Sequence, residues 1–220
     1  MIEELLPVSI AVVECRSDDE STFLLPEERP LVGRAVDSRI REFTIARSCA
    51  RQALGKLGFP PVPILRGPKG EPLWPAGIVG SITHCKGYRA AAVAMQTKIS
   101  AIGIDAEIDD ALPPEVLNSI CVEEEIAWLS QTRDRLHWDR IIFSAKESVY
   151  KAWFPLTRRW LGFEEVAITI EAAGNSFSAQ PLVNLPSELD QALRRFAGRF
   201  VVRDGLVLTT VVLPRTPDAL

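Results

Sequence analysis

Three stretches of this 220-residue sequence carry residue types that can bind a metal ion or a phosphate. The first is Gly-Ile-Asp-Ala-Glu at 103–107, where Asp105 and Glu107 end an apolar run. Side chains alternate across a strand, so the two carboxylates project from the same face. They repel each other unless a cation lies between them, and Mg²⁺ prefers such oxygen ligands. A solvent-facing strand edge would show the same pair, so this motif alone decides nothing.

The second stretch is a helical pattern at 143–153 that contains Glu147 and Lys151. Residues four apart share a helical face, so the pair is either an exposed ion pair or part of a site. Apolar residues flank it nearly all round, which favours burial. A partly buried glutamate one turn from a lysine suits metal ligation beside proton transfer or phosphate contact.

The third stretch is a set of polar residues that a phosphate could contact. Thr83 and His84 end an apolar run, and the loop at 66–70 reads Arg-Gly-Pro-Lys-Gly. Two bases among glycines can close on a phosphate through their side chains and backbone amides. A single histidine is more often a structural hydrogen-bonding residue than a catalyst, and we give His137 that structural interpretation.

Charge is distributed unevenly along the chain. Residues 29–69 hold nine basic and two acidic side chains, whereas residues 105–125 hold eight acidic and no basic ones. The two regions are either differently charged solvated faces or an anion site followed by a cation site. The net charge of -4 does not favour a nucleic acid as partner.

Hydrophobic periodicity predicts an α+β chain. Strands are expected near 9–15, 78–83, 90–95, 101–107, 166–171, 200–203 and 206–213, with Asp204-Gly205 as the turn of a final hairpin. Helices are expected at 37–58 with Asp37 as the cap, at 114–129, at 138–153 stopped by Pro155, and at 187–196. Residues 59–75 hold six prolines and predict an ordered functional loop.

The sequence gives no sign of export or membrane insertion. It has no run of about 20 apolar residues and begins with acidic residues, so we expect a cytoplasmic protein with no membrane partner. Its four cysteines form no C-x-x-C pair, which predicts reduced, mostly buried thiols.

Taken in order, these motifs resemble the 4'-phosphopantetheinyl transferase superfamily. The resemblance is to the branch of the surfactin-synthetase-activating enzymes and enterobactin synthase component D, and within it to actinobacterial members. It covers about residues 37–165 and rests on the motifs at 103–107 and 143–151, with further likeness at 74–85 and 153–163.

The resemblance implies an enzyme that moves the phosphopantetheine arm of coenzyme A to a serine of an apo carrier protein and releases adenosine 3',5'-bisphosphate. Asp105, Glu107 and Glu147 would hold Mg²⁺, to which Ala106 would offer at most its backbone carbonyl or a nearby water. Asp105, Glu147 and Lys151 would be the catalytic residues. Either Glu147 or a metal-bound water would take the serine proton, and Lys151 would contact the phosphate.

The resemblance also implies contacts to coenzyme A. Its phosphates would be bound by Arg39, Arg47, Arg66, Gly67, Lys69, Thr83, His84, Lys146 and Lys151. Arg39 and Arg47 lie about 80° apart around a helix, which permits shared access to one ligand.

The fold that the resemblance implies has two pseudo-symmetric α/β halves with the active site in the cleft between them. Residues 1–105 would bind the phosphates of coenzyme A, and residues 106–220 would complete the metal site. We expect a monomer that acts on apo acyl carrier or peptidyl carrier proteins of fatty-acid, polyketide or nonribosomal-peptide type, siderophore pathways included. Its basic first half could dock an acidic carrier, with Arg51 and Lys56 as test positions.

Two rival functions remain open. A Mg²⁺-dependent nucleotide phosphohydrolase would use the same carboxylates on water and would release phosphopantetheine without any carrier. A non-catalytic module that binds coenzyme A would not need Asp105, Glu107, Glu147 and Lys151 together. The choice between Mg²⁺ and Mn²⁺ also stays open, because both accept oxygen ligands.

Overall fold

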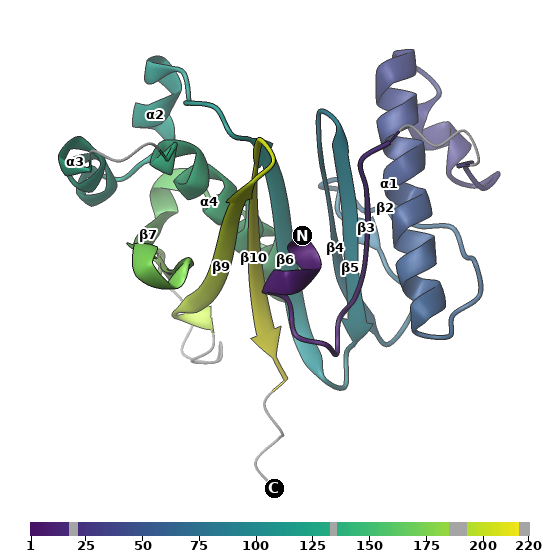
Figure 1. Ribbon diagram of the computed structural model, residues 1–220. Coiled ribbons are helices and arrows are strands. Elements are labelled where there is room, and N and C mark those ends of the chain that lie inside the picture. The colour runs from purple at the N-terminus through teal and green to yellow at the C-terminus, as the bar shows by residue number, and fades with distance from the viewer. Residues whose placement is uncertain (18–21, 133–135, 185–192, 216–220) are drawn as a thin grey trace, which may run out of the picture.

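Two antiparallel sheets lie side by side, each with one 20-residue helix on its outer face (Figure 1). The computed structural model describes residues 1–17, 22–132, 136–184 and 193–215. The strand order is β1-β5-β4 in the first sheet and β6-β10-β9-β8-β7 in the second. The predicted α+β class is confirmed.

The elements of the first sheet and its helix come first along the chain. They are η1 (Ile2–Leu5), β1 (Ala11–Cys15), η2 (Arg29–Val32), α1 (Asp37–Lys56), β2 (Leu65–Arg66), β3 (Pro72–Leu73), β4 (Ile78–Cys85) and β5 (Tyr88–Met95). β2 and β3 form a small hairpin of their own inside the proline-rich loop.

The elements of the second sheet follow. They are β6 (Ile99–Ile108), α2 (Pro114–Ile120), α3 (Glu123–Gln131), α4 (Trp138–Thr157), η3 (Phe163–Glu165), β7 (Val166–Glu171), η4 (Ala172–Gly174), β8 (Ser176–Pro181), β9 (Phe196–Arg203) and β10 (Leu206–Pro214). The predicted boundary between residues 105 and 106 falls inside β6.

The alternation of small side chains along β5 builds two cores at once. Ala91 and Val93 belong to the core beneath α1, whereas Ala90 and Ala92 belong to the core between the sheets. The short η1 segment closes the second of these cores, between the two sheets in Figure 1. A third core lies between α4 and the second sheet. Because β5 contributes to cores on both of its faces, the two sheets pack as one unit.

β4 and β6 meet where the two sheets face each other, and serine and threonine hydroxyls join them. The Ser81 hydroxyl accepts a hydrogen bond from the Ile104 amide at 3.1 Å, and the Thr83 hydroxyl accepts one from the Ala106 amide at 3.0 Å. The ladder of β6 is formed with β10 on its other side. Side chains therefore replace backbone pairing at this junction.

The structure corrects several predicted boundaries. Pro155 lies inside α4, which continues to Thr157, because a proline in the last turn removes only one intrahelical hydrogen bond. The single helix expected at 114–129 is two helices, α2 and α3. Asp37 is the first residue of α1 rather than its cap. Strand β8 was not predicted.

Other expectations have mixed outcomes. The hairpin turn is confirmed, with positive φ at both Asp204 and Gly205. Of the helix expected at 187–196, residues 187–192 lie outside the described part of the chain, and Phe196 begins β9. All four cysteines are free thiols. Within the described ranges, no helix combines the length and apolar character needed to cross a membrane.

Candidate active site

Helix α4 lies along β6 in a register that matches one helical turn to two strand residues. Arg140 contacts Glu107, Ser144 contacts Asp105, and the Ser148 carbonyl packs on Gly103. Four helical residues rise about 6 Å and two strand residues about 6.8 Å, so the spacing persists over two turns. The strand and the helix therefore run antiparallel and bring their polar side chains together.

Gly103 permits this close approach. A Cβ atom at position 103 would lie 1.8 Å from the Ser148 carbonyl oxygen. Any side chain there would push α4 away from β6 and separate Asp105 from its helix partners.

Asp105 is held by three donors from two elements. Its Oδ1 accepts hydrogen bonds from Thr83 at 3.2 Å and from Lys151 Nζ at 2.7 Å, and its Oδ2 accepts one from Ser144 at 2.8 Å. Burial alone would lower the pKa of Lys151, but the negative charges of Asp105 and Glu147 outweigh it and raise that pKa. Lys151 is therefore a fixed cation beside a fixed carboxylate.

Glu107 and Glu147 complete an acidic cluster with Asp105. Burial, followed by the charge of Asp105, raises the pKa of Glu107 to about 7. Burial also raises the pKa of Glu147, although the charge of Lys151 opposes this effect. The charge of Asp105 also raises the pKa of Glu147, so Glu107 and Glu147 each favour a cation beside Asp105. Carboxylate oxygens are the donors that Mg²⁺ prefers, so the donor set fits this ion.

The side chains are not gathered as a finished metal site. In the part of the chain that the structure describes, no three or more histidine, cysteine or acidic side chains are arranged around a common point that could hold an ion. Lys151 and Arg140 instead supply positive charge to Asp105 and Glu107, at 2.7 and 3.2 Å respectively.

A basic cluster of Arg39, Arg47, Arg66 and His84 lies beside the acidic cluster. Arg39 donates a hydrogen bond to His84 Nε2 at 2.7 Å, and burial followed by the charge of Arg39 lowers the pKa of His84. His84 follows Thr83 on β4, and Thr83 donates to Asp105, so His84 lies between the two clusters.

Two arginines of the basic cluster flank the ring of Phe43. The guanidinium carbons of Arg47 and Arg66 lie 4.3 and 5.2 Å from the ring centroid. Arg47 is buried and donates to the Ile64 carbonyl at 2.8 Å, and burial lowers its pKa to about 10. Burial and then the charge of Arg39 lower the pKa of Arg66. Crowded guanidinium groups that lower one another's pKa favour an anion.

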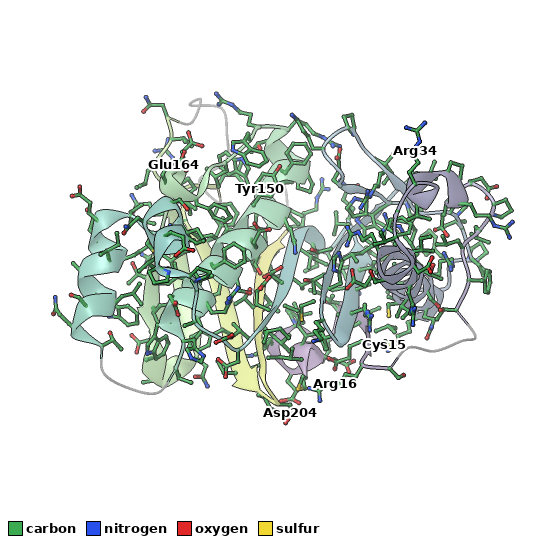
Figure 2. The ribbon with its side chains drawn as sticks, turned by 90° about the horizontal axis from the view of Figure 1, so that it is seen from above. Cys15, Arg16, Arg34, Tyr150, Glu164 and Asp204 are labelled. Atoms are coloured by element: carbon green, nitrogen blue, oxygen red, sulfur yellow. The ribbon has the colours of Figure 1, made fainter. Side chains whose placement is uncertain are left out.

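Two cavities open beside the acidic cluster, and Lys69, Glu147 and Tyr150 line both. One encloses about 450 Å³ between the β2–β3 hairpin, β4, β6 and α4, and the other about 400 Å³ next to Trp160. Figure 2 shows Tyr150 on α4, in the middle of the molecule. The larger cavity has the size typical of small-molecule sites.

The loop at 66–71 is closed by its own glutamate. The Gly67 amide donates to the Glu71 carbonyl at 2.8 Å, and the Lys69 amide donates to the Glu71 carboxylate at 3.0 Å. Arg158, just after α4, contacts that carboxylate at 3.3 Å. The backbone amides of Gly67 and Lys69, which were expected to bind a phosphate, thus donate to Glu71. The contact of Gly67 with coenzyme A stays a prediction.

Some predicted site residues lie away from the clusters. Lys146 is buried and contacts Glu125 at 2.7 Å, with further bonds to the Ile120 and Phe163 carbonyls. The structure therefore gives Lys146 a packing role between α3 and α4. Ala106 is buried in the core between the sheets, and its amide is bound to Thr83.

Of the two positions chosen to test carrier docking, only one lies on the surface. Arg51 is buried against Glu28 at 2.6 Å, so reversing its charge would disturb packing. Lys56 is exposed and donates to the Val12 carbonyl at 2.6 Å, and its part in docking stays a prediction. Arg34 is also exposed and projects from the outer edge of the molecule in Figure 2.

Arg140 and Ser144 contact the acidic cluster but were not predicted. Together with Glu147 and Lys151 they form a polar stripe at spacings of four, three and four residues on α4. Residues with these spacings share one helical face, so the stripe was readable as a signal in the sequence.

The chain matches known proteins along nearly its whole length. The 4'-phosphopantetheinyl transferase N-terminal domain matches residues 27–94, and the 4'-phosphopantetheinyl transferase superfamily matches residues 101–205. The chain is 46% identical over 222 residues to 4'-phosphopantetheinyl transferase PptT of Mycobacterium tuberculosis, covering 97% of the chain and 98% of that relative. The chain belongs to the 4'-phosphopantetheinyl transferase superfamily.

Other members of the superfamily extend the comparison. 4'-Phosphopantetheinyl transferase Npt of Nocardia iowensis is 46% identical over 221 residues, covering 96% of the chain and 99% of the relative. Enterobactin synthase component D of Salmonella typhi is 36% identical over 121 residues, covering 52% of the chain and 48% of the relative. The predicted resemblance to the superfamily and to its actinobacterial members is confirmed, and the chain is an enzyme of the transferase type.

Proposed function

We propose that this enzyme transfers the phosphopantetheine arm of coenzyme A to a serine of apo acyl carrier or peptidyl carrier proteins. The observation that carries the proposal is the position of His84, which accepts a hydrogen bond from Arg39 of the basic cluster and follows Thr83, the donor to Asp105 of the acidic cluster. A ligand with separate phosphate groups and a reacting phosphorus atom needs both clusters at once.

The basic cluster supports binding of the phosphates of coenzyme A. After burial, the charge of Arg39 also lowers the pKa of Arg47 and of Arg66, so these guanidinium groups repel one another and an anion would relieve that repulsion. His84 lies beside them and accepts a hydrogen bond from Arg39. Lys69 lines both cavities together with Glu147, which lies in the middle of α4. The larger cavity, beside Lys151, has room for an extended arm.

Asp105, Glu107 and Glu147 would hold Mg²⁺. When bound there, the ion would neutralise negative charge on the pyrophosphate. Lys151, already fixed by Asp105, would contact the phosphate under attack or the leaving group. Ala106 could take part only through its backbone.

In the proposed reaction the carrier serine oxygen forms a bond to the phosphorus that bears the pantetheine arm. The bond from that phosphorus to the oxygen of adenosine 3',5'-bisphosphate breaks. Glu147 can take the serine proton, because burial raises its pKa and makes it a better base than an exposed carboxylate. We expect the enzyme to work as a monomer in the cytoplasm, where coenzyme A and carriers occur.

Mass spectrometry of intact carriers tests the transfer. An apo acyl carrier protein and an apo peptidyl carrier domain are each incubated with the enzyme, coenzyme A and Mg²⁺. We expect a gain of one phosphopantetheine group that EDTA abolishes. Cleavage of coenzyme A without a gain on either carrier would support the phosphohydrolase instead. Neither cleavage nor gain would support a binding module.

A matched pair of variants tests the assigned base and ligand. Glu147→Gln should abolish transfer while the midpoint of thermal unfolding stays close to that of the parent chain. Glu171→Gln, at an exposed glutamate that ends β7, should leave transfer unchanged. Near-normal turnover by Glu147→Gln would show that the assigned site is wrong.

A further inference from the structure

Arg140 is fixed in place by groups other than Glu107. Its Nε donates to the Asp110 carbonyl at 2.9 Å, and one terminal nitrogen donates to the Ala111 carbonyl at 3.3 Å. Its guanidinium carbon lies 6.0 Å from the centre of the Phe143 ring. A planar guanidinium with three fixed directions is a rigid donor, unlike a lysine ammonium on a flexible stem.

The remaining terminal nitrogen of Arg140 reaches Glu107. It donates to Oε2 at 3.2 Å, and the side chains are 16% and 25% exposed respectively. Among the described residues no hydrogen bond to Oε1 is formed, so one carboxylate oxygen is bound and the other is available. The contact therefore restricts the rotation of Glu107 without using all its lone pairs.

We propose that Arg140 is a positioning residue that holds Glu107 with one oxygen turned toward the metal site. This inference rests on the proposed function, in which Glu107 is a metal ligand. The register between α4 and β6 supports it, because Arg140 stands one helical turn before Ser144, which contacts Asp105 in the same way. Each carboxylate of the strand thus has its own donor on the helix. Such partners typically change metal affinity by about 10- to 100-fold when they are removed.

Binding of Mn²⁺ tests the inference without any carrier protein. Electron paramagnetic resonance of free Mn²⁺ gives the Kd for the wild-type chain and its variants, each saturated with coenzyme A. Arg140→Met keeps an apolar stem beside Phe143 and should weaken Mn²⁺ binding about tenfold. Arg140→Lys keeps the positive charge but not the planar guanidinium, so its Kd for Mn²⁺ should lie between those of Arg140→Met and the wild type.

His137→Gln is the matched control. His137 contacts Asp109 at 2.9 Å and so tethers the same loop to the start of α4 without touching Glu107. Its Mn²⁺ affinity should equal that of the wild type, and all variants should unfold at similar temperatures. The inference would be overturned if Arg140→Met bound Mn²⁺ as tightly as the wild type or more tightly. It would also be overturned if Arg140→Lys had the Kd of the wild type, or if the wild-type protein bound no Mn²⁺.

A double-mutant cycle shows whether Arg140 acts through Glu107. In a Glu107→Gln background, Arg140→Met should cause no further loss of affinity, because the contact is already altered. A further tenfold loss would mean that Arg140 acts elsewhere and would overturn the inference. In carrier assays, Arg140→Met should raise the KM for Mg²⁺ and leave kcat at saturating Mg²⁺ nearly unchanged.

The result is separable from that of the proposed function. A chain whose Mn²⁺ affinity follows these expectations but that modifies no carrier would overturn the transferase proposal and leave the role of Arg140 standing. A chain that modifies carriers but whose Mn²⁺ affinity ignores Arg140 would overturn the positioning role alone.

Discussion

The Asp105 carboxylate cannot rotate freely, because three donors occupy both of its oxygens. Lys151 and Thr83 bind Oδ1, and Ser144 binds Oδ2. Ser144 is itself held by Thr209, whose hydroxyl donates to the Ser144 carbonyl at 2.9 Å. Asp105 is thus a fixed negative charge, whereas burial raises the pKa of both Glu107 and Glu147, so these two carboxylates accept a proton more readily than an exposed one.

The Lys151–Asp105 pair should contribute to folding as well as to catalysis. Replacing Lys151 by Met leaves a nearly buried carboxylate without its cation, which is expected to lower the free energy of unfolding by about 2–4 kcal/mol. Urea denaturation measures the loss. In an Asp105→Asn background, Lys151→Met should lower the free energy of unfolding by much less. An equal loss in both backgrounds would show that the Lys151–Asp105 pair does not cause the destabilisation.

His84 should titrate below its ordinary value of 6.5 in the free enzyme, because burial and the charge of Arg39 disfavour the imidazolium. The folded chain then binds this proton less readily than the unfolded chain, so the contribution of His84 to stability falls as the pH drops below 6.5. NMR titration can measure the pKa of His84, because the sequence holds only two histidines and the His137→Gln variant identifies the signal of His137. Adenosine 3',5'-bisphosphate should raise the pKa of His84, and a fixed value on binding would contradict the anion site.

At the scale of elements, the contact of α4 with β6 determines whether the site exists. Gly103→Ala would place a Cβ 1.8 Å from the Ser148 carbonyl, so the helix must move. We expect a loss of about 1–3 kcal/mol in the free energy of unfolding and loss of transfer activity. Chemical denaturation and the carrier assay measure the two effects.

Gly55→Ala is the control for that substitution. Gly55 lies in α1, where a Cβ atom would have no neighbour within 4 Å beyond the adjoining residues and the backbone of its own helix. Alanine there should stabilise the chain by up to about 1 kcal/mol, because glycine costs that much inside a helix. Equal destabilisation by the two substitutions would show that close packing at Gly103 is not the reason.

Much of the element order was predictable from local patterns. β-branched runs predicted β6 and β7, and the Asp204-Gly205 turn predicted the final hairpin, since these signals depend on neighbours in sequence. The sequence did not predict that α4 continues past Pro155. The helix ends at Thr157 because Arg158 takes a positive φ, a conformation that an arginine does not signal in the sequence. β8 alternates Ser176, Ser178 and Gln180 with buried Phe177, Ala179 and Pro181, but it holds no β-branched residue, so its strand character depends on pairing with β7 and β9.

The candidate site was predictable only in part for a similar reason. The motifs at 103–107 and 143–151 identify Asp105, Glu147 and Lys151, which the structure brings together. Lys146 has the same residue type but faces Glu125 on α3, and no local pattern separates a lysine in a site from a lysine in an ion pair. Arg140 lies outside the motif, and although its spacing places it on the same helical face as Glu147, its contact with Glu107 follows only from the register of α4 and β6.

At the scale of the whole molecule, the two sheets share a core and should unfold together. Leu208 is fully buried between them, next to residues of β5 and β6. Leu208→Ala should lower the free energy of unfolding by about 2–5 kcal/mol. Amide hydrogen exchange should show α1 and α4 losing protection at the same urea concentration, in the wild type and in the variant. Separate loss in the two helices would contradict a shared core.

The hydroxyl junction between β4 and β6 makes this molecule vulnerable to ordinary point mutation in an unusual way. A substitution within a sheet rarely breaks the ladder, because the ladder is made of backbone that every residue supplies. Here two backbone amides depend on the hydroxyls of Ser81 and Thr83, so a single change to valine at either position removes a partner from the main chain of another strand. The junction between β4 and β6 therefore depends on the identity of two side chains, and a neutral substitution at either position can remove one of its two hydrogen bonds.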